Sequence, residues 1–178
     1  MTTVTPLARH VLDTLRPIPN YPKPGIIFQD ITPVLRDGPL FRAIVDAMAD
    51  PFRDADVTHV LGIEARGFIL GGAVATNLGA GFVPARKPGK LPWERVAETY
   101  DLEYGTDALE CHRDGLPEPA RVLIVDDVLA TGGTARAAGQ LARTLGAEVV
   151  GWSFLLEIAG LGGLEKLQGA VSHVLARR

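Results

Sequence analysis

The sequence predicts a single α/β domain in which a parallel, twisted sheet is flanked by helices. Short apolar runs rich in β-branched residues recur along the chain, at 58–63, 122–125 and 148–158, and a segment with helical spacing follows each of the first two. Such alternation of strand and helix is typical of a parallel sheet with helices on both faces. The chain has 178 residues, 47% of them hydrophobic, which suffices for one domain with a sizeable core.

Composition and charge argue against several classes of protein. A net charge of −3 gives no general attraction to nucleic acid or to an anionic membrane. The single cysteine, Cys111, fits a reducing compartment and is expected to pack as a small hydrophobic residue. No apolar run approaches the roughly 20 residues of a membrane span, and residues 1–10 lack the apolar core of a secretory signal. We therefore expect a soluble cytoplasmic protein with no nucleic-acid or membrane partner.

The most informative stretch is 121–134, in which an apolar strand, an acidic pair and a glycine turn follow one another. The pair is Asp126 and Asp127. Glycines let backbone N–H groups approach a ligand closely, and a helix N-terminus suits a phosphate. Adjacent carboxylates repel an anion, so they could accept hydrogen bonds from sugar hydroxyls or favour a cation nearby. The stretch predicts a site for a ribose that carries a phosphate, with the turn formed by Ala130, Thr131, Gly132, Gly133 and Thr134.

An ordinary strand–turn–helix connection would contain a similar glycine turn, and it remains the alternative. The acidic pair argues against it, because two adjacent like charges are costly without a partner. The turn also lacks the closing Gly-Lys-Ser/Thr of a Walker A loop and the G-x-G-x-x-G of a dinucleotide fingerprint.

A second strand–turn–helix unit is predicted over 58–78, with its turn at 64–68. Arg66 in this turn is well placed to bind phosphate oxygens through its planar guanidinium, although a surface arginine is the alternative. After a short strand at 81–85, a Gly/Pro-containing loop carries Arg86, Lys87, Lys90 and Arg95. These residues predict a mobile cationic flap that could close over a polyanion, or else a solvated run of charges.

The other segments are interpreted from their spacing. Helices are predicted over about 7–15 and from Asp37 onward, and four prolines between 17 and 24 are expected to preclude regular structure. The apolar element 25–28 could cover a flat ligand or join the core. Segment 98–105 is expected to be the returning arm of the flap, and 108–112 a strand leading back to the core. The four histidines are dispersed, so no metal site built from protein ligands is predicted.

Residues 122–134 resemble the 5-phosphoribosyl 1-diphosphate signature of type I phosphoribosyltransferases. The similarity runs from about Pro19 to about Leu167 and is most specific at 21–28, 64–68, 86–92 and 98–105. It implies one domain over 1–178, with a small N-terminal hood at about 17–33 and a flexible catalytic loop at about 86–106. It further implies the family's adenine-specific reaction, in which adenine and 5-phosphoribosyl 1-diphosphate give AMP and pyrophosphate.

The resemblance also implies roles for individual residues. Asp126, Asp127 and the 130–134 turn would bind the ribose and 5′-phosphate, and the bond between Glu64 and Ala65 would be a strained peptide. Glu103 would handle the proton lost by adenine, although an exposed strand-end glutamate is the alternative. Pyrophosphate would contact Ala65, Arg66, Gly67, Arg86, Lys87 and Lys90. Three of these residues, Arg66, Lys87 and Lys90, would share the catalytic role with Glu103. Adenine would contact Ile27, Phe28, Gln29 and Ile158.

Two further implications and two rival functions complete these expectations. The resemblance implies a homodimer, and Mg²⁺ is expected to bind mainly through substrate oxygens and waters, as this ion prefers. Gln29 departs from the arginine common in the family, but the family's contact there is largely through the backbone. The base could instead be another purine. The chain could also be a sensor that binds the phosphoribosyl compound without turnover, although it keeps the flap and Glu103, which a sensor would not need.

Overall fold

The computed structural model describes residues 4–101, 105–167 and 169–178, and its core is one parallel sheet. The predicted fold class is confirmed. All neighbouring strands of this sheet run parallel. Their order across the sheet is β4 (Gly81–Ala85), β3 (His59–Ile63), β7 (Arg121–Leu129), β8 (Glu148–Glu157) and β9 (Val171–Arg177).

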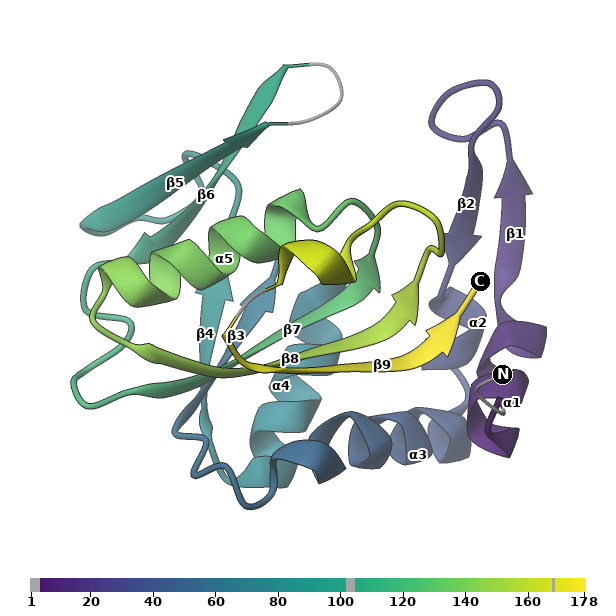
Figure 1. Cartoon of the computed structure of the whole chain (residues 1–178), viewed down its shortest axis with the longest axis horizontal. Coiled ribbons are helices and arrows are strands. Elements are labelled where there is room, and N and C mark those ends of the chain that lie inside the picture. The colour runs from purple at the N-terminus through teal and green to yellow at the C-terminus, as the bar shows by residue number, and fades with distance from the viewer. Residues whose placement is uncertain (1–3, 102–104, 168) are drawn as a thin grey trace.

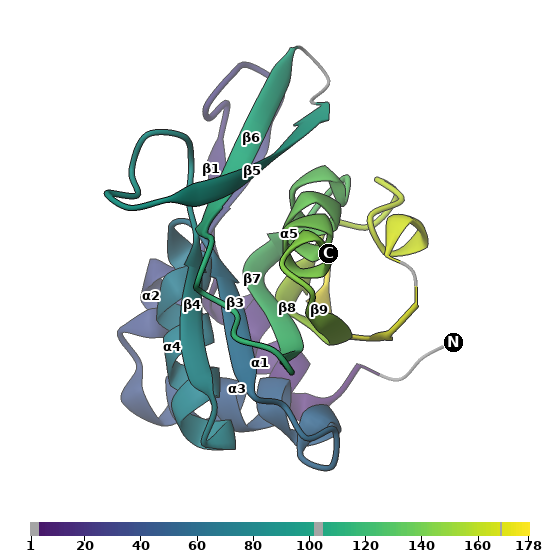
Figure 2. The same ribbon diagram turned by 90° about the vertical axis from the view of Figure 1, so that its left-hand side faces the viewer.

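Helices cover both faces of the sheet (Figures 1 and 2). On one face lie α1 (Pro6–Thr14), α3 (Gly38–Ala49) and α4 (Arg66–Leu78), and on the other lies α5 (Gly133–Thr144). Successive residues of β7 alternate between the two faces, because Leu123 packs with the first group and Ile124 with α5. This burial on both faces explains why β7 reads as a continuous apolar run rather than an alternating one.

The predicted helices begin where capping residues allow. Thr5 Oγ1 accepts a hydrogen bond from Ala8 N at 3.1 Å before α1, and Asp37 Oδ1 accepts one from Leu40 N at 3.0 Å before α3. Three short helices were not predicted: α2 (Thr32–Leu35), η1 (Asp50–Phe52) and η2 (Leu164–Lys166).

The prediction that prolines preclude regular structure after the first helix was wrong. Strand β1 (Arg16–Pro19) pairs antiparallel with β2 (Ile27–Asp30), and this two-stranded hood stands beside the main sheet (Figure 1). Pro17 and Pro19 occupy alternate positions of β1. In an antiparallel pair, alternate residues direct their N–H groups away from the partner strand, so a two-stranded edge tolerates proline there.

The interpretation of 98–105 as a returning arm was also wrong. Strand β5 (Arg95–Asp101) leads outward and β6 (Thr106–His112) returns, with Tyr100 opposite Asp107 near the far end of the hairpin. The hairpin lies above α5 (Figure 2), and a bridge between Arg86 and Glu110 joins its base to the end of β4. Cys111 in β6 is fully buried, as expected, and burial raises the pKa of its thiol to about 11.

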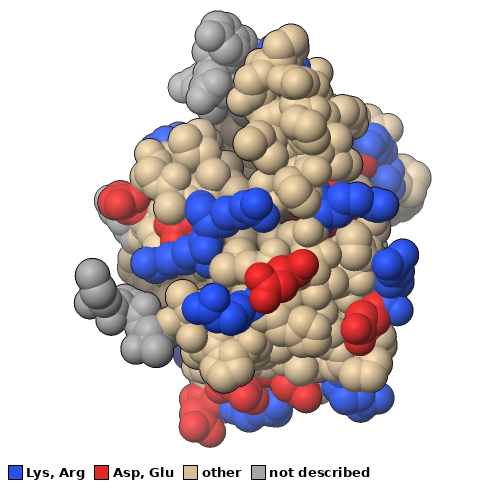
Figure 3. All heavy atoms as spheres, turned by 90° about the vertical axis from the view of Figure 1, so that its right-hand side faces the viewer, with Lys and Arg blue, Asp and Glu red and all other residues tan. Residues whose placement is uncertain are grey.

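The C-terminal segment, for which the sequence suggested no role, forms edge strand β9. Beyond it, Arg178 Nη1 donates a hydrogen bond to Gln29 Oε1 at 3.0 Å and so ties the sheet edge to the hood. On the side of the molecule that faces right in Figure 1, basic and acidic side chains are interspersed (Figure 3).

The contact between α5 and β8 provides a test of the core packing. A Cβ added at Gly139 would overlap the Trp152 ring, whose residue is 1% exposed, whereas one added at Gly72 of α4 meets nothing within 4 Å. We expect Gly139→Ala to destabilise the protein by about 1–3 kcal/mol through overpacking. The control Gly72→Ala should stabilise it by about 0.5–1 kcal/mol. Urea unfolding of both variants measures this; equal stabilities would contradict the packing.

Candidate active site

The predicted site residues meet at the carboxyl edge of the sheet, where β3 and β7 lie side by side. Each strand leads into a helix, β3 into α4 and β7 into α5. Neither helix has a side-chain cap at its N-cap residue, Ala65 or Gly132. Backbone N–H groups of both first turns are therefore available to an anion at the same edge.

A small cavity of about 90 Å³ lies at the glycine turn. Gly132 adopts a φ of +77°, and a Cβ there would lie 2.6 Å from the carbonyl oxygen of Gly163. The turn therefore needs glycine both for its conformation and for close approach to the loop after β8. The cavity is lined by six of the seven residues predicted for ribose and 5′-phosphate: Asp126, Ala130, Thr131, Gly132, Gly133 and Thr134.

The acidic pair lies within β7 rather than at its end, because the strand continues to Leu129. Asp127 is 5% exposed and accepts a hydrogen bond from Arg66 Nε. Asp126 Oδ1 accepts a hydrogen bond from the Asp127 backbone N–H at 2.8 Å. Burial, followed by the neighbouring charge of Asp127, raises the pKa of Asp126 well above its ordinary value. The two carboxyls thus differ, and Asp127 is the one with a cationic partner.

Arg66 connects three parts of the site. It is the first residue of α4, it pairs with Asp127 of β7, and its guanidinium carbon lies 5.0 Å from the centre of the Phe28 ring in the hood. The following residue, Gly67, permits close approach, because a Cβ there would lie 2.7 Å from Asp126 Oδ1. The peptide bond between Glu64 and Ala65, which precedes this turn, is cis.

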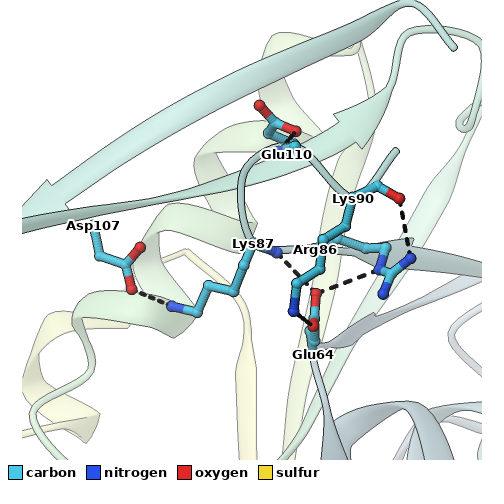
Figure 4. Close-up of polar contacts among 7 residues, drawn as sticks. Glu64, Arg86, Lys87, Lys90, Asp107 and Glu110 are labelled. Atoms are coloured by element: carbon cyan, nitrogen blue, oxygen red, sulfur yellow. Dashed lines mark hydrogen bonds and ion pairs between the residues drawn. The ribbon is translucent and has the colours of Figure 1, made fainter. Parts of the chain in front are cut away.

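The three basic residues after β4 all have carboxylate partners (Figure 4). Lys90 Nζ and Arg86 Nε both contact the Glu64 carboxylate, the latter at 3.3 Å. Lys87 Nζ instead extends toward Asp107 of β6, and it also donates to the Tyr100 hydroxyl at 2.6 Å. Burial alone would lower the pKa of Lys87, but the bonds to Asp107 and Tyr100 raise it. The sequence-predicted cations are therefore brought to the site, each in an ion pair.

The residues predicted for adenine lie in the hood and after β8. Ile27 is 60% exposed, Phe28 is half-buried and packs edge-on against Tyr21, and the Gln29 side chain is buried against Arg178. Ile158 N donates to Leu129 O at 2.9 Å at the end of β8. Since Arg178 N also donates to Glu157 O at 3.0 Å, the C-terminal segment links the hood to the residue before Ile158.

One predicted site residue is not described by the structure, and three residues of the site were not predicted. Glu103, predicted to handle a proton, and its neighbour Tyr104 lie outside the described residues. Sequence reasoning missed Tyr100 and Asp107 as partners of Lys87, although the two face each other across the hairpin. It also missed Glu64 as a partner of Arg86 and Lys90. Treating 95–112 as a hairpin of two strands could have placed Tyr100 opposite Asp107. No local sequence signal indicates that Glu64 pairs with Arg86 and Lys90.

A further cavity lies away from these residues, and the described residues form neither a membrane-spanning helix nor a cluster of metal ligands. A cavity of about 460 Å³ lies between β5, α5 and η2, and none of the predicted site residues lines it. In 4–101, 105–167 and 169–178, no helix is long and apolar enough to cross a membrane. Over the same ranges, no group of three or more His, Cys, Asp or Glu side chains is arranged to hold a metal ion.

The raised pKa of Asp126 gives a pH-dependent prediction. Because the pKa of Asp126 is higher in the folded than in the unfolded state, ionisation of this carboxyl lowers the free energy of unfolding. This loss of stability is absent below the ordinary aspartate pKa and grows as the pH rises toward the pKa of the folded state. Asp126→Asn should therefore raise the midpoint of thermal unfolding at neutral pH and leave it unchanged in acid. The matched control Asp127→Asn weakens the pairing of Arg66 and should lower the midpoint at neutral pH. A stabilisation by Asp126→Asn that is the same at all pH values would be incompatible with this account.

Comparison with known proteins agrees with the geometry. The model of the phosphoribosyl transferase domain matches residues 32–166. An adenine phosphoribosyltransferase of Myxococcus xanthus is 55% identical over 165 residues, which are 93% of this chain and 90% of that protein. The crystal structure of adenine phosphoribosyltransferase from Rhodothermus marinus matches with a TM-score of 0.93 at 48% identity, covering 97% of this chain and 98% of that one. The Saccharomyces cerevisiae enzyme in a complex that contains adenine matches with a TM-score of 0.89 at 39% identity, covering 95% and 98%. This chain therefore belongs to the phosphoribosyltransferase family.

Proposed function

We propose that the protein transfers the 5-phosphoribosyl group from 5-phosphoribosyl 1-diphosphate to adenine, giving AMP and pyrophosphate in purine salvage. The observation that carries this proposal is the juxtaposition of three subsites at one sheet edge. The glycine turn before α5 suits a 5′-phosphate, the acidic pair of β7 suits ribose hydroxyls, and the turn before α4 carries Arg66 beside them. The adenine phosphoribosyltransferase of Xanthomonas axonopodis, 59% identical to this chain over 157 residues, supports the choice of base.

The acidic pair has a role in the chemistry as well as in binding. The bond that breaks joins ribose C1′ to the diphosphate, so positive charge develops on the sugar ring. Carboxylates held close to that ring stabilise the charge without reorganising. Asp127 is already fixed by Arg66, and the backbone hydrogen bond from Asp127 to Asp126 fixes the other carboxyl. This chain's contribution is thus a preorganised pair of carboxyl groups beside the ribose, of which Asp127 is held by Arg66.

The leaving pyrophosphate is held by cations from two segments. Arg66, with Ala65 and Gly67, contributes the turn before α4, and Arg86, Lys87 and Lys90 contribute the loop after β4. Their positive charges stabilise the charge that accumulates on the leaving group. Mg²⁺ would bind through diphosphate oxygens and waters, and when bound it supplies further neutralisation of that charge.

Adenine is placed by the hood, with Ile27 and Phe28 against its flat face and Ile158 at its edge. The exposed Ile27 side chain gains an apolar surface to contact, and backbone groups near Gln29 recognise the edge of the base. Glu103, carried by the flap over 86–106, takes the ring proton that adenine loses as the new bond forms. The hood over 17–33 and the flap thus close the site from two sides of one domain, residues 1–178.

Product formation provides the direct test. With Mg²⁺ and 5-phosphoribosyl 1-diphosphate, the protein should convert adenine to AMP and leave hypoxanthine and guanine unconverted. Asp127→Ala and Glu103→Ala should each lower kcat by on the order of 100-fold or more, because each removes a group that acts in the transition state. Turnover of another purine but not adenine would overturn the hood assignment. Tight binding of the phosphoribosyl compound with no product from any base would favour a sensor.

The protein is further proposed to be a cytoplasmic homodimer. The proposed subunit interface includes the β4 side of the molecule, where α4 packs on the edge strand. Large apolar side chains are exposed there and on the loop that follows: Ile69, Phe82 and Trp93, with Trp93 64% exposed. Exposed apolar groups of this size are commonly covered by a partner. The single, buried Cys111 fits a reducing compartment.

Light scattering coupled to size exclusion tests the dimer. The double variant Ile69→Lys, Trp93→Ser should shift the mass from dimer toward monomer, because it places charge and removes apolar area at the proposed interface. Val171→Ser is the matched control, since Val171 is 61% exposed on β9, at the opposite edge of the sheet. A monomeric wild-type protein, or dissociation caused equally by the control, would contradict this interface.

A further inference from the structure

Glu64 lies where two cations of the proposed pyrophosphate subsite, Arg86 and Lys90, converge. Its side chain is 9% exposed, and three groups donate to it. Lys90 Nζ reaches one carboxylate oxygen; the Lys87 backbone N–H at 2.9 Å and Arg86 Nε at 3.3 Å reach the other. Figure 4 shows the side chains of Lys90 and Arg86 directed toward Glu64 from the loop above it. This carboxylate therefore binds donors that an incoming anion would need.

The charge state of Glu64 fits that position. Burial by itself would raise the pKa of the carboxyl, but the hydrogen bonds from Lys90 and Lys87 and the charges of Lys90 and Arg86 outweigh burial and lower it. Glu64 is thus ionised at neutral pH. It immediately precedes Ala65, Arg66 and Gly67, so its carboxylate occupies the start of the turn to which the leaving group is assigned.

We infer that Glu64 is an internal anion that competes with pyrophosphate for Lys90 and Arg86. It thereby lowers the affinity of this subsite for anions and assists release of the product. The inference rests on the proposed function. An anion that binds must first displace the Glu64 carboxylate from the cations. When pyrophosphate leaves, the carboxylate returns and prevents the cations from being left unpaired.

The competition has a specific thermodynamic consequence. The free energy needed to displace Glu64 is the same for every anion that uses these cations, so removing the Glu64 charge should tighten all of them by a similar factor. We expect orthophosphate to make fewer contacts than pyrophosphate and to bind more weakly. Its affinity should nevertheless increase by a similar factor when the Glu64 charge is removed. A residue that merely shaped the turn would show no such common factor.

The test uses Glu64→Gln, which keeps the size of the side chain and an acceptor for the Lys87 N–H but removes the charge. Dissociation constants for inorganic pyrophosphate and for orthophosphate would be measured by calorimetry, with Mg²⁺ and saturating AMP so that the 5′-phosphate site is occupied. We expect both constants to fall on the order of tenfold, and stopped-flow release of pyrophosphate to slow in proportion.

Glu110→Gln is the matched control. Glu110 is also buried beside the same loop, but its carboxylate accepts from Arg95 Nε at 2.9 Å and Gly89 N at 3.0 Å. Its contact with Arg86 is made by the backbone, which the substitution leaves in place. Glu110→Gln should leave both constants unchanged. A second background separates competition from a local distortion of the turn. In a Lys90→Met background, Glu64→Gln should increase the affinity for pyrophosphate much less, because one of the two cations that Glu64 binds is absent.

The outcomes separate this inference from the function on which it rests. Wild-type protein that binds no pyrophosphate beside AMP would overturn the subsite and the inference together. Wild-type protein that binds pyrophosphate as expected, with Glu64→Gln folded by circular dichroism but binding no more tightly, would overturn the inference alone. A gain for pyrophosphate without a gain for orthophosphate would also overturn it, because a competitor for shared cations must release both.

Discussion

The ion pair between Arg66 and Asp127 is the contact on which the arrangement of the site depends. β7 carries two adjacent carboxylates into a largely buried strand, and like charges so close together require a cationic partner. Arg66 supplies it from the first residue of α4, and its guanidinium also lies over the Phe28 ring. One side chain therefore fixes the turn before α4, the carboxylates of β7 and the hood relative to one another. Breaking such a partly buried pair leaves an uncompensated charge on the more buried partner.

A second feature is that the cations assigned to pyrophosphate are balanced by carboxylates of the same chain. Arg66 has Asp127, Lys87 has Asp107, and Arg86 and Lys90 share Glu64. The cations of these pairs are between 33% and 47% exposed, so an incoming diphosphate can reach them. The pairs nevertheless hold the loop after β4 and the hairpin in place while the site contains no anion. Binding then becomes an exchange of one set of ion pairs for another.

The C-terminal segment contributes to the site from outside it. β9 adds the last strand of the sheet, and its extension through Arg178 bonds to Glu157 at the end of β8 and to Gln29 of the hood. The hood is a two-stranded hairpin, and such a hairpin has little stability by itself. Its attachment to the sheet edge through Arg178, and to α4 through Arg66, gives it the support that the proposed adenine-binding surface requires.

The sequence alone determined the fold class, the glycine turn with its acidic pair and the basic loop, because each depends on residues close together in the chain. Apolar periodicity identifies a two-sided parallel strand, and Gly132 is required by the φ of its own turn. The tertiary structure decided what those local patterns leave open. It paired Glu64 with residues more than 20 positions away, turned a proline-rich segment into a strand and gave the C-terminal segment a sheet edge. Partners distant in sequence carry no periodic signal, since only the folded sheet brings them within hydrogen-bonding distance.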